Sequence, residues 1–139
     1  MFSKILFAHD GGMLAERAMV YLEHVARVEE AEVTVLHVYA PPQRYSAAEG
    51  YEALCEQFEE IAQEIVDDAV TALADRGVTA HGLVLPGESA QVILETADRE
   101  DSSLIVMGSR GPSSMADLVL GSVSLEVLRH ARCPVLVVP

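Results

Sequence analysis

The feature of this chain that most constrains its fold is an alternation between two kinds of hydrophobic segment. Four short runs are apolar at nearly every position and rich in β-branched residues, which is typical of parallel strands covered on both faces. These runs are residues 5–8, 33–38, 104–107 and Val135–Val138. A fifth candidate strand, residues 78–85, is weaker because Gly82 interrupts it.

Segments with helical periodicity lie between these runs. Apolar side chains repeat about every 3.6 residues within 14–25, 54–73, 88–97 and 121–130. Gly77 is placed to end the second of these helices. The order βαβαβαβαβ predicts an α/β, Rossmann-like fold, with an open parallel five-stranded sheet and helices on both faces. A chain of 139 residues has room for one such domain, so residues 1–139 are predicted to form a single domain.

Ligands of such sheets bind outside the carboxyl ends of the strands, where the strand order reverses. The loops at that edge are residues 9–12, 39–47, 86–89 and 108–120. The chain as a whole has 22 Asp and Glu against 9 Lys and Arg, but residues 102–139 carry three arginines against two carboxylates. Because this segment is less acidic than the rest of the chain, the loop of residues 108–120 is the favoured place for an anionic ligand.

The composition excludes several classes of function. The net charge of −13 argues against generic binding to nucleic acid or to an anionic membrane, because both need a basic face. Lys4 is the only lysine, so neither a P-loop nor a pyridoxal-phosphate enzyme is expected. Cys55 and Cys133 lie far apart and the histidines lack metal-binding spacing, so no metal site is predicted. With no disulfide framework, signal peptide or membrane span visible, we expect a cytoplasmic protein.

The strongest local signal is a spacing of glycines. Gly108 and Gly111 follow the fourth apolar run, and Gly121-Ser122 opens the last helix after nine intervening residues. Glycine lets the backbone approach a ligand closely, and a helix N-terminus offers unpaired N–H groups and a positive dipole. This geometry suits phosphates. The alternative is a glycine-rich turn followed by a serine N-cap.

The pattern Gly108-x2-Gly111-x9-Gly121-Ser122 resembles the nucleotide-binding signature of the universal stress protein family. The resemblance extends along the whole chain. Residues 5–11 resemble the family's opening strand and acidic turn, residues 35–38 its second strand, and residues 123–138 its closing helix and strand. The glycine spacing is that of the ATP-binding branch. One departure is Gly12, where the family usually has Ser or Thr and thus a possible N-cap for the first helix.

The resemblance implies a role for most residues of a cofactor site. Asp10 would meet the ribose or the adenine edge, the Val38 backbone would meet adenine, and Met107 and Gly108 would line the ribose. N–H groups of Gly111, Gly121, Ser122 and Val123 would hold the phosphates, helped by the Ser122 hydroxyl. The whole predicted site is Ala8, Asp10, Val38, Met107, Gly108, Arg110, Gly111, Gly121, Ser122, Val123 and Ser124. From the residues alone, Asp10 could instead be a turn carboxylate and Arg110 a solvated loop arginine.

The resemblance implies an ATP-binding regulatory protein that acts in stress response through nucleotide-dependent association with an unidentified protein. Any Mg²⁺ would be held through the phosphates. Two alternatives stay open, namely a slow ATPase or phosphotransferase, and an adaptor subunit without bound nucleotide. Phosphoryl transfer favours a cationic clamp and a metal-binding carboxylate, and the loop offers only Arg110 and Asp117. No catalytic residue is therefore predicted.

The last apolar run also predicts a partner. The family's strand order, 3-2-1-4-5, places Val135–Val138 at an edge of the sheet, and this run contains no charged residue. An unprotected apolar edge pairs readily with another strand. We therefore expect a homodimer in which two copies of this strand pair antiparallel. Burial of the strand under the chain's own helices is the alternative.

Overall fold

Five parallel strands form one sheet in the computed structural model, which describes residues 1–110 and 120–139. The strands are β1 (Lys4–Ala8), β2 (Glu32–Tyr39), β3 (Thr79–Pro86), β4 (Leu104–Gly108) and β5 (Val135–Val138). Their order in the sheet is β3-β2-β1-β4-β5. The predicted parallel sheet with order 3-2-1-4-5 is therefore confirmed, and the weaker fifth candidate is β3.

β1 lies in the middle of the sheet. Ile5 is opposite Val33 of β2 on one side and Leu104 of β4 on the other. Ile5, Leu6 and Phe7 are buried, because β1 has strands on both edges and helices on both faces. The strand order reverses between β1 and β4, which is where the fold predicts a ligand.

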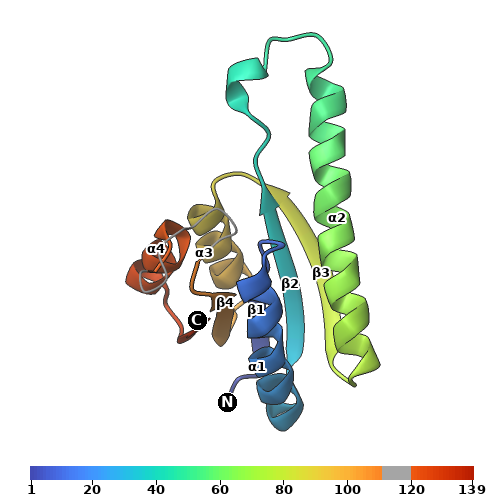
Figure 1. The fold of residues 1–139 in the computed structure, drawn as a ribbon. Helices are drawn as coiled ribbons and strands as arrows, with labels where there is room; N and C mark the ends of the chain where they lie inside the picture. The colour runs from blue at the N-terminus through green and yellow to red at the C-terminus, as the bar shows by residue number, and fades with distance from the viewer. Residues whose placement is uncertain (111–119) are drawn as a thin grey trace.

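The described residues contain four α-helices in two layers. These are α1 (Met13–Glu29), α2 (Tyr51–Asp75), α3 (Ser89–Arg99) and α4 (Ser122–His130), and a short 3-10 turn, η1 (Gln43–Tyr45), precedes α2. α1 and α2 pack on the face that carries Phe7, and α3 and α4 pack on the face that carries Leu6 (Figure 1). The predicted covering of both faces is confirmed. Within residues 1–110 and 120–139, no helix combines the length and apolar character needed to cross a membrane.

Gly82 interrupts the apolar pattern of β3 because α2 packs directly against it. A Cβ atom on Gly82 would overlap Cγ1 of Val66, which is a buried side chain of α2. Gly82, which made the prediction of β3 weaker, is thus the residue that allows α2 to pack closely on β3. The predicted end of α2 is also confirmed: Gly77 has φ +80° and its N–H donates to the Ala74 carbonyl at 3.0 Å.

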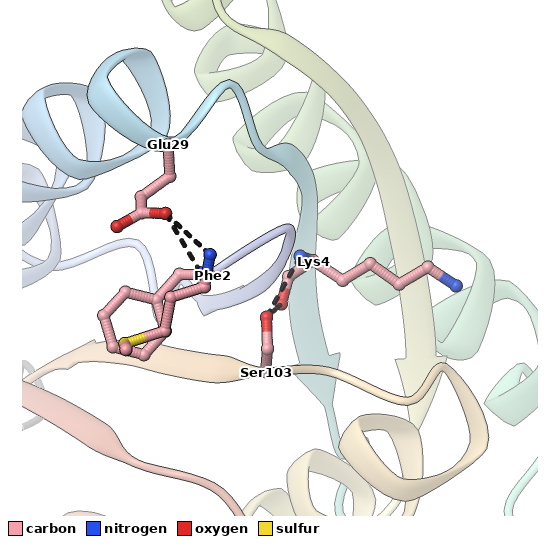
Figure 2. Close-up of polar contacts among 5 residues, drawn as sticks. Phe2, Lys4, Glu29 and Ser103 are labelled. Atoms are coloured by element: carbon pink, nitrogen blue, oxygen red, sulfur yellow. Dashed lines mark hydrogen bonds and ion pairs between the residues drawn. The ribbon is translucent and has the colours of Figure 1, made fainter.

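Hydrogen bonds fix the amino end of β1, away from the predicted ligand loops (Figure 2). The Phe2 N–H donates to the Glu29 carboxylate at 3.3 Å. The Ser103 hydroxyl accepts from the Lys4 N–H at 3.1 Å and donates to the Lys4 carbonyl at 3.0 Å. These contacts hold β1 in place at one end and leave its carboxyl end for the site.

Candidate functional site

A cavity of about 340 Å³ opens at the carboxyl ends of β1, β2 and β4, beside the first residues of α3 and α4. Small-molecule sites typically enclose about 300–1,000 Å³. Every predicted site residue within the described ranges lines this cavity, namely Ala8, Asp10, Val38, Met107, Gly108, Arg110, Gly121, Ser122, Val123 and Ser124. Gly111 lies outside the described residues. Contact of any of these residues with a ligand stays a prediction.

One wall of the cavity is apolar and consists of Leu36, Val38, Ile93 and Met107. The backbone groups of a strand point alternately towards its two neighbours. The Leu36 carbonyl accepts from the His9 N–H at 2.9 Å on the β1 side. The Val38 backbone, two residues further along, therefore faces the same side, beyond the end of β1. A flat heteroaromatic ring suits a wall of this kind.

The polar part of the cavity lining includes the N-terminus of α4. Its N-cap residue, Gly121, has no side chain to cap the helix, and the N–H groups of the first turn lack intrahelical acceptors. Ser122 and Val123 supply such groups beside the cavity. The Gly121 N–H, in contrast, donates to the Ser109 carbonyl at 2.8 Å. Without a ligand, the Gly121 N–H is thus bonded inside the protein, and its predicted contact with a phosphate stays a prediction.

The Ser124 hydroxyl also has partners inside the protein. It is buried and lies 3.0 Å from the Gly108 carbonyl oxygen and 2.9 Å from that of Ser109. The Ser124 hydroxyl thus joins the start of α4 to the end of β4, and contact of Ser124 with a ligand stays a prediction. Ser122 is exposed, and its hydroxyl is the better candidate for a ligand donor.

Gly108 is needed for helix packing. A Cβ atom at this position would lie 3.0 Å from the carbonyl carbon and Cβ of Leu14 and 3.2 Å from the Ala15 nitrogen. The first turn of α1 therefore approaches the end of β4 more closely than a side chain allows. Gly108 lines the cavity as the sequence predicted, and the close approach that the structure shows there is that of α1.

The turn between β1 and α1 is organised by its own side chains. The Gly12 N–H donates to Asp10 Oδ1 at 2.8 Å, and the Gly11 N–H donates to His9 Nδ1 at 2.9 Å. Gly12 provides no side-chain cap for α1, as the sequence predicted. Asp10 is exposed at the cavity, so its carboxylate serves the local turn through one oxygen and also faces the site.

His9, Leu36, Ser89 and Ile93 line the cavity without having been among the predicted site residues. Ser89 belongs to a loop that the topology had singled out, and Leu36 and Ile93 look like ordinary core residues in the sequence. His9 is buried, and this burial lowers the pKa of its ring below the usual value, against the charges of Glu16 and Asp10. A histidine directly after an apolar strand is the signal that could have found it.

Asp10 and Arg110 bring opposite charges to the described part of the cavity lining. Arg110 is half-buried and follows β4 closely. Within the described ranges, no three His, Cys, Asp or Glu side chains gather in a way that could hold a metal ion. The described lining thus combines an apolar wall, an uncapped helix N-terminus, the Asp10 carboxylate and the Arg110 guanidinium. This arrangement suits a molecule with a flat apolar part and an anionic part.

The model of the universal stress protein family matches residues 1–139. The chain belongs to this family. Universal stress protein YxiE of Bacillus subtilis is 37% identical over 147 residues, which cover 99% of each chain. Among solved structures, universal stress protein MJ0577 of Methanocaldococcus jannaschii has a TM-score of 0.90 at 28% identity and covers 99% of this chain and 96% of its own. The predicted membership of the universal stress protein family is confirmed.

Two further universal stress proteins of the same fold were solved with a nucleotide. One, in complex with cAMP, has a TM-score of 0.73 at 22% identity over 99% of this chain and 96% of its own. The other, from Archaeoglobus fulgidus in complex with dAMP, has a TM-score of 0.70 at 20% identity over 100% of this chain and 98% of its own. At these identities the likeness concerns the fold.

Proposed function

We propose that this universal stress protein binds an adenine nucleotide, ATP in first place, in the cavity at the carboxyl ends of β1, β2 and β4. The observation that carries the proposal is the pairing, within one cavity, of an apolar wall with an uncapped helix N-terminus. Adenine is flat and has hydrogen-bonding edges, and phosphates are favoured where helix N–H groups and the helix dipole converge. An adenine nucleotide would match the apolar wall with its base and the helix N-terminus with its phosphates.

Each part of the nucleotide has candidate partners in the lining. Adenine would pack on Val38 and Met107 and meet the Val38 backbone beyond the end of β1. The ribose would lie near Asp10. The phosphates would meet the N–H groups of Ser122 and Val123, and Mg²⁺ would be held through the phosphates. The cAMP and dAMP complexes of proteins with this fold support the choice of an adenine nucleotide.

The proposed role is regulatory: nucleotide binding changes which proteins the chain associates with, in stress response. Phosphoryl transfer usually employs a metal-binding carboxylate and a positioned base. Asp10 is the carboxylate in the described lining, and one of its oxygens already serves the turn. We therefore expect at most slow ATP hydrolysis. We also place the protein in a reducing cytoplasm, where Cys55 and Cys133 stay as thiols.

Mass spectrometry of small molecules released from freshly purified, denatured protein tests the proposal. An adenine nucleotide in stoichiometric amount is the expected result, and its identity separates ATP from ADP, AMP and cyclic nucleotides. Protein that releases no nucleotide, and that binds none when ATP is added, would instead favour an adaptor. Rapid turnover of added ATP would favour an enzyme.

A further inference from the structure

We propose that His9 is a positioning residue for the candidate nucleotide site: its neutral ring holds the turn that presents Asp10, and a proton on Nδ1 releases that turn. The effect of His9 protonation on ligand binding rests on the proposed function. The effect of His9 protonation on the turn does not, because the turn can be observed without a ligand.

The hydrogen bonds of the His9 ring define its protonation state. Nδ1 lies 2.9 Å from the Gly11 nitrogen and accepts its N–H. The ring proton is therefore on Nε2, which lies 3.2 Å from Glu16 Oε1 and donates to it. One imidazole thus connects the β1–α1 turn to the first turns of α1. The ring is buried beside Phe7, with 5.2 Å between the ring centroids.

Asp10 is held between two anchored residues. On one side, the His9 N–H donates to the Leu36 carbonyl at 2.9 Å, and the His9 carbonyl accepts from His37 Nδ1 at 2.7 Å. On the other side, Gly11 is tied to the His9 ring at φ +85°, a conformation that glycine adopts readily. The turn around Asp10 is therefore closed by two hydrogen bonds, from the Gly11 N–H to His9 Nδ1 and from the Gly12 N–H to Asp10 Oδ1, and only the first depends on the His9 ring.

Protonation removes that contact. A proton on Nδ1 turns the acceptor into a donor that faces the Gly11 N–H, so one of the two must move. The groups whose charges act on the ring are Glu16 of α1, Asp10 of the turn and His37 of β2, while α2 presents the apolar Ile65 to Gly11. Burial is the largest influence and lowers the pKa of His9. The turn is thus closed at neutral pH and opens in acid.

Adenosine is the probe of choice for the pH profile, because it lacks the phosphates of ATP, which themselves titrate in this range. We expect its affinity for the wild-type protein to be constant above about pH 6.5. Below the pKa of His9, the affinity should fall by up to about tenfold per pH unit, since binding then requires loss of one proton.

Four variants separate positioning from a merely structural role. His9→Asn keeps an acceptor near Nδ1 that no proton removes, so its affinity should be independent of pH. His9→Gln carries its amide further out, towards the place of Nε2, and should bind adenosine about tenfold more weakly at every pH.

Glu16→Gln removes a charge that raises the pKa of His9, so the fall in affinity should begin at lower pH. His24→Asn, an exposed position on α1, is the matched control and should follow the wild-type profile.

The ligand-free readout is the Gly11 amide resonance in an NMR pH titration of wild type and of His9→Asn. We expect the wild-type amide to shift with the titration of the His9 ring and the variant amide to stay constant. A Gly11 amide that ignores the His9 titration would overturn the proposal, as would a flat adenosine profile in wild type. If no protein binds adenosine at any pH while the Gly11 amide follows His9, the proposed function fails and the role of His9 in the turn stands. Should His9→Asn not fold, Glu16→Gln tests the proposal instead. The Gly11 amide shift and the fall in adenosine affinity should then both move to lower pH, and unchanged profiles would overturn the proposal.

Discussion

Asp10 can serve the turn and a ligand at the same time, because a carboxylate has two oxygens. Oδ1 accepts from the Gly12 N–H at 2.8 Å, and the exposed side chain lines the cavity. Neither contact excludes the other. Whether Asp10 also binds a ligand is therefore tested with one variant that removes its side-chain acceptor and one that keeps an acceptor but removes the charge.

Asp10→Ala should weaken the binding of adenosine and of ATP alike, because the carboxylate is assigned to the ribose or the base. Loss of a charge-assisted hydrogen bond costs about 1.5–3 kcal/mol, or about ten- to a hundredfold in affinity. Asp10→Asn keeps an acceptor for the Gly12 N–H and is the matched control for the turn. Calorimetric titration of wild type and both variants, each with adenosine and with ATP, measures these affinities. A loss confined to ATP would contradict the assignment of Asp10 to the nucleoside.

The buried ring of His9 also makes the stability of the fold depend on pH. Because burial lowers the pKa of His9 in the folded protein, the unfolded chain takes up a proton on this ring at a higher pH than the folded chain does. The contribution of the neutral ring to stability is therefore fully present above about pH 6.5 and is lost as the pH falls through the folded pKa.

Urea unfolding between about pH 7.5 and pH 5.5 measures this effect. The free energy of unfolding of wild type should decrease over this range by more than that of His9→Asn, since the variant has no ring to protonate. The exposed variant His24→Asn should match wild type. Parallel curves for wild type and His9→Asn would show that His9 is not protonated preferentially in the unfolded state.

At the scale of elements, two glycines set how closely the helices of one layer approach the sheet. Gly108 admits the first turn of α1 to the end of β4, and Gly82 admits Val66 of α2 to β3. Both close approaches lie on the face that α1 and α2 cover. They depend on the absence of a Cβ atom rather than on a special backbone conformation, because neither glycine has a positive φ.

A double-mutant cycle tests the packing of α2 on β3. Gly82→Ala should destabilise the protein by about 1–3 kcal/mol, because its methyl group overlaps Val66. Val66→Ala makes room for that methyl group, so the double variant should lose less stability than the two single variants together. Urea unfolding of wild type, the two single variants and the double variant gives the free energies of the cycle. Strictly additive losses would mean that the methyl group on residue 82 and the Val66 side chain do not meet.

The sequence predicted the strands, and the residues that line one cavity at their carboxyl ends, because those features follow from local patterns. β1, β2, β4 and β5 are continuous apolar runs, and the switch between β1 and β4 follows from their order. It could not predict hydrogen-bond partners. The Gly121 N–H and the Ser124 hydroxyl are taken up by carbonyls near the end of β4, and those contacts exist only once α4 has packed. The link from His9 to Gly11 and Glu16 likewise depends on how the turn folds.

At the scale of the whole molecule, β5 is an edge strand, as predicted. Leu136 packs towards the α1 and α2 layer, and Val135 and Val137 pack towards the α3 and α4 layer. The chain's own helices therefore cover the faces of β5 only in part, since these three residues are half-buried. The outer edge of the strand is where a second copy would pair, and the homodimer stays our prediction.

Val137→Lys should convert the expected dimer into a monomer, because it places a charge in the proposed seam. Sedimentation velocity measures the change. Thr79→Lys, at an exposed position on the opposite edge strand β3, is the matched control and should leave the dimer intact. Circular dichroism checks that both variants fold. A wild-type protein that stays monomeric at high micromolar concentration would dispose of the dimer.

Calorimetric titration of ATP into wild type and Gly121→Val tests the central claim, nucleotide binding at the N-terminus of α4, most directly. Gly121 has φ −67° and ψ 163°, which valine also adopts, so this substitution changes the space in front of the helix and not its backbone. We predict that wild type binds one ATP per chain and that the folded variant binds it at least about tenfold more weakly. Unchanged ATP affinity in the folded Gly121→Val protein would contradict the phosphate site.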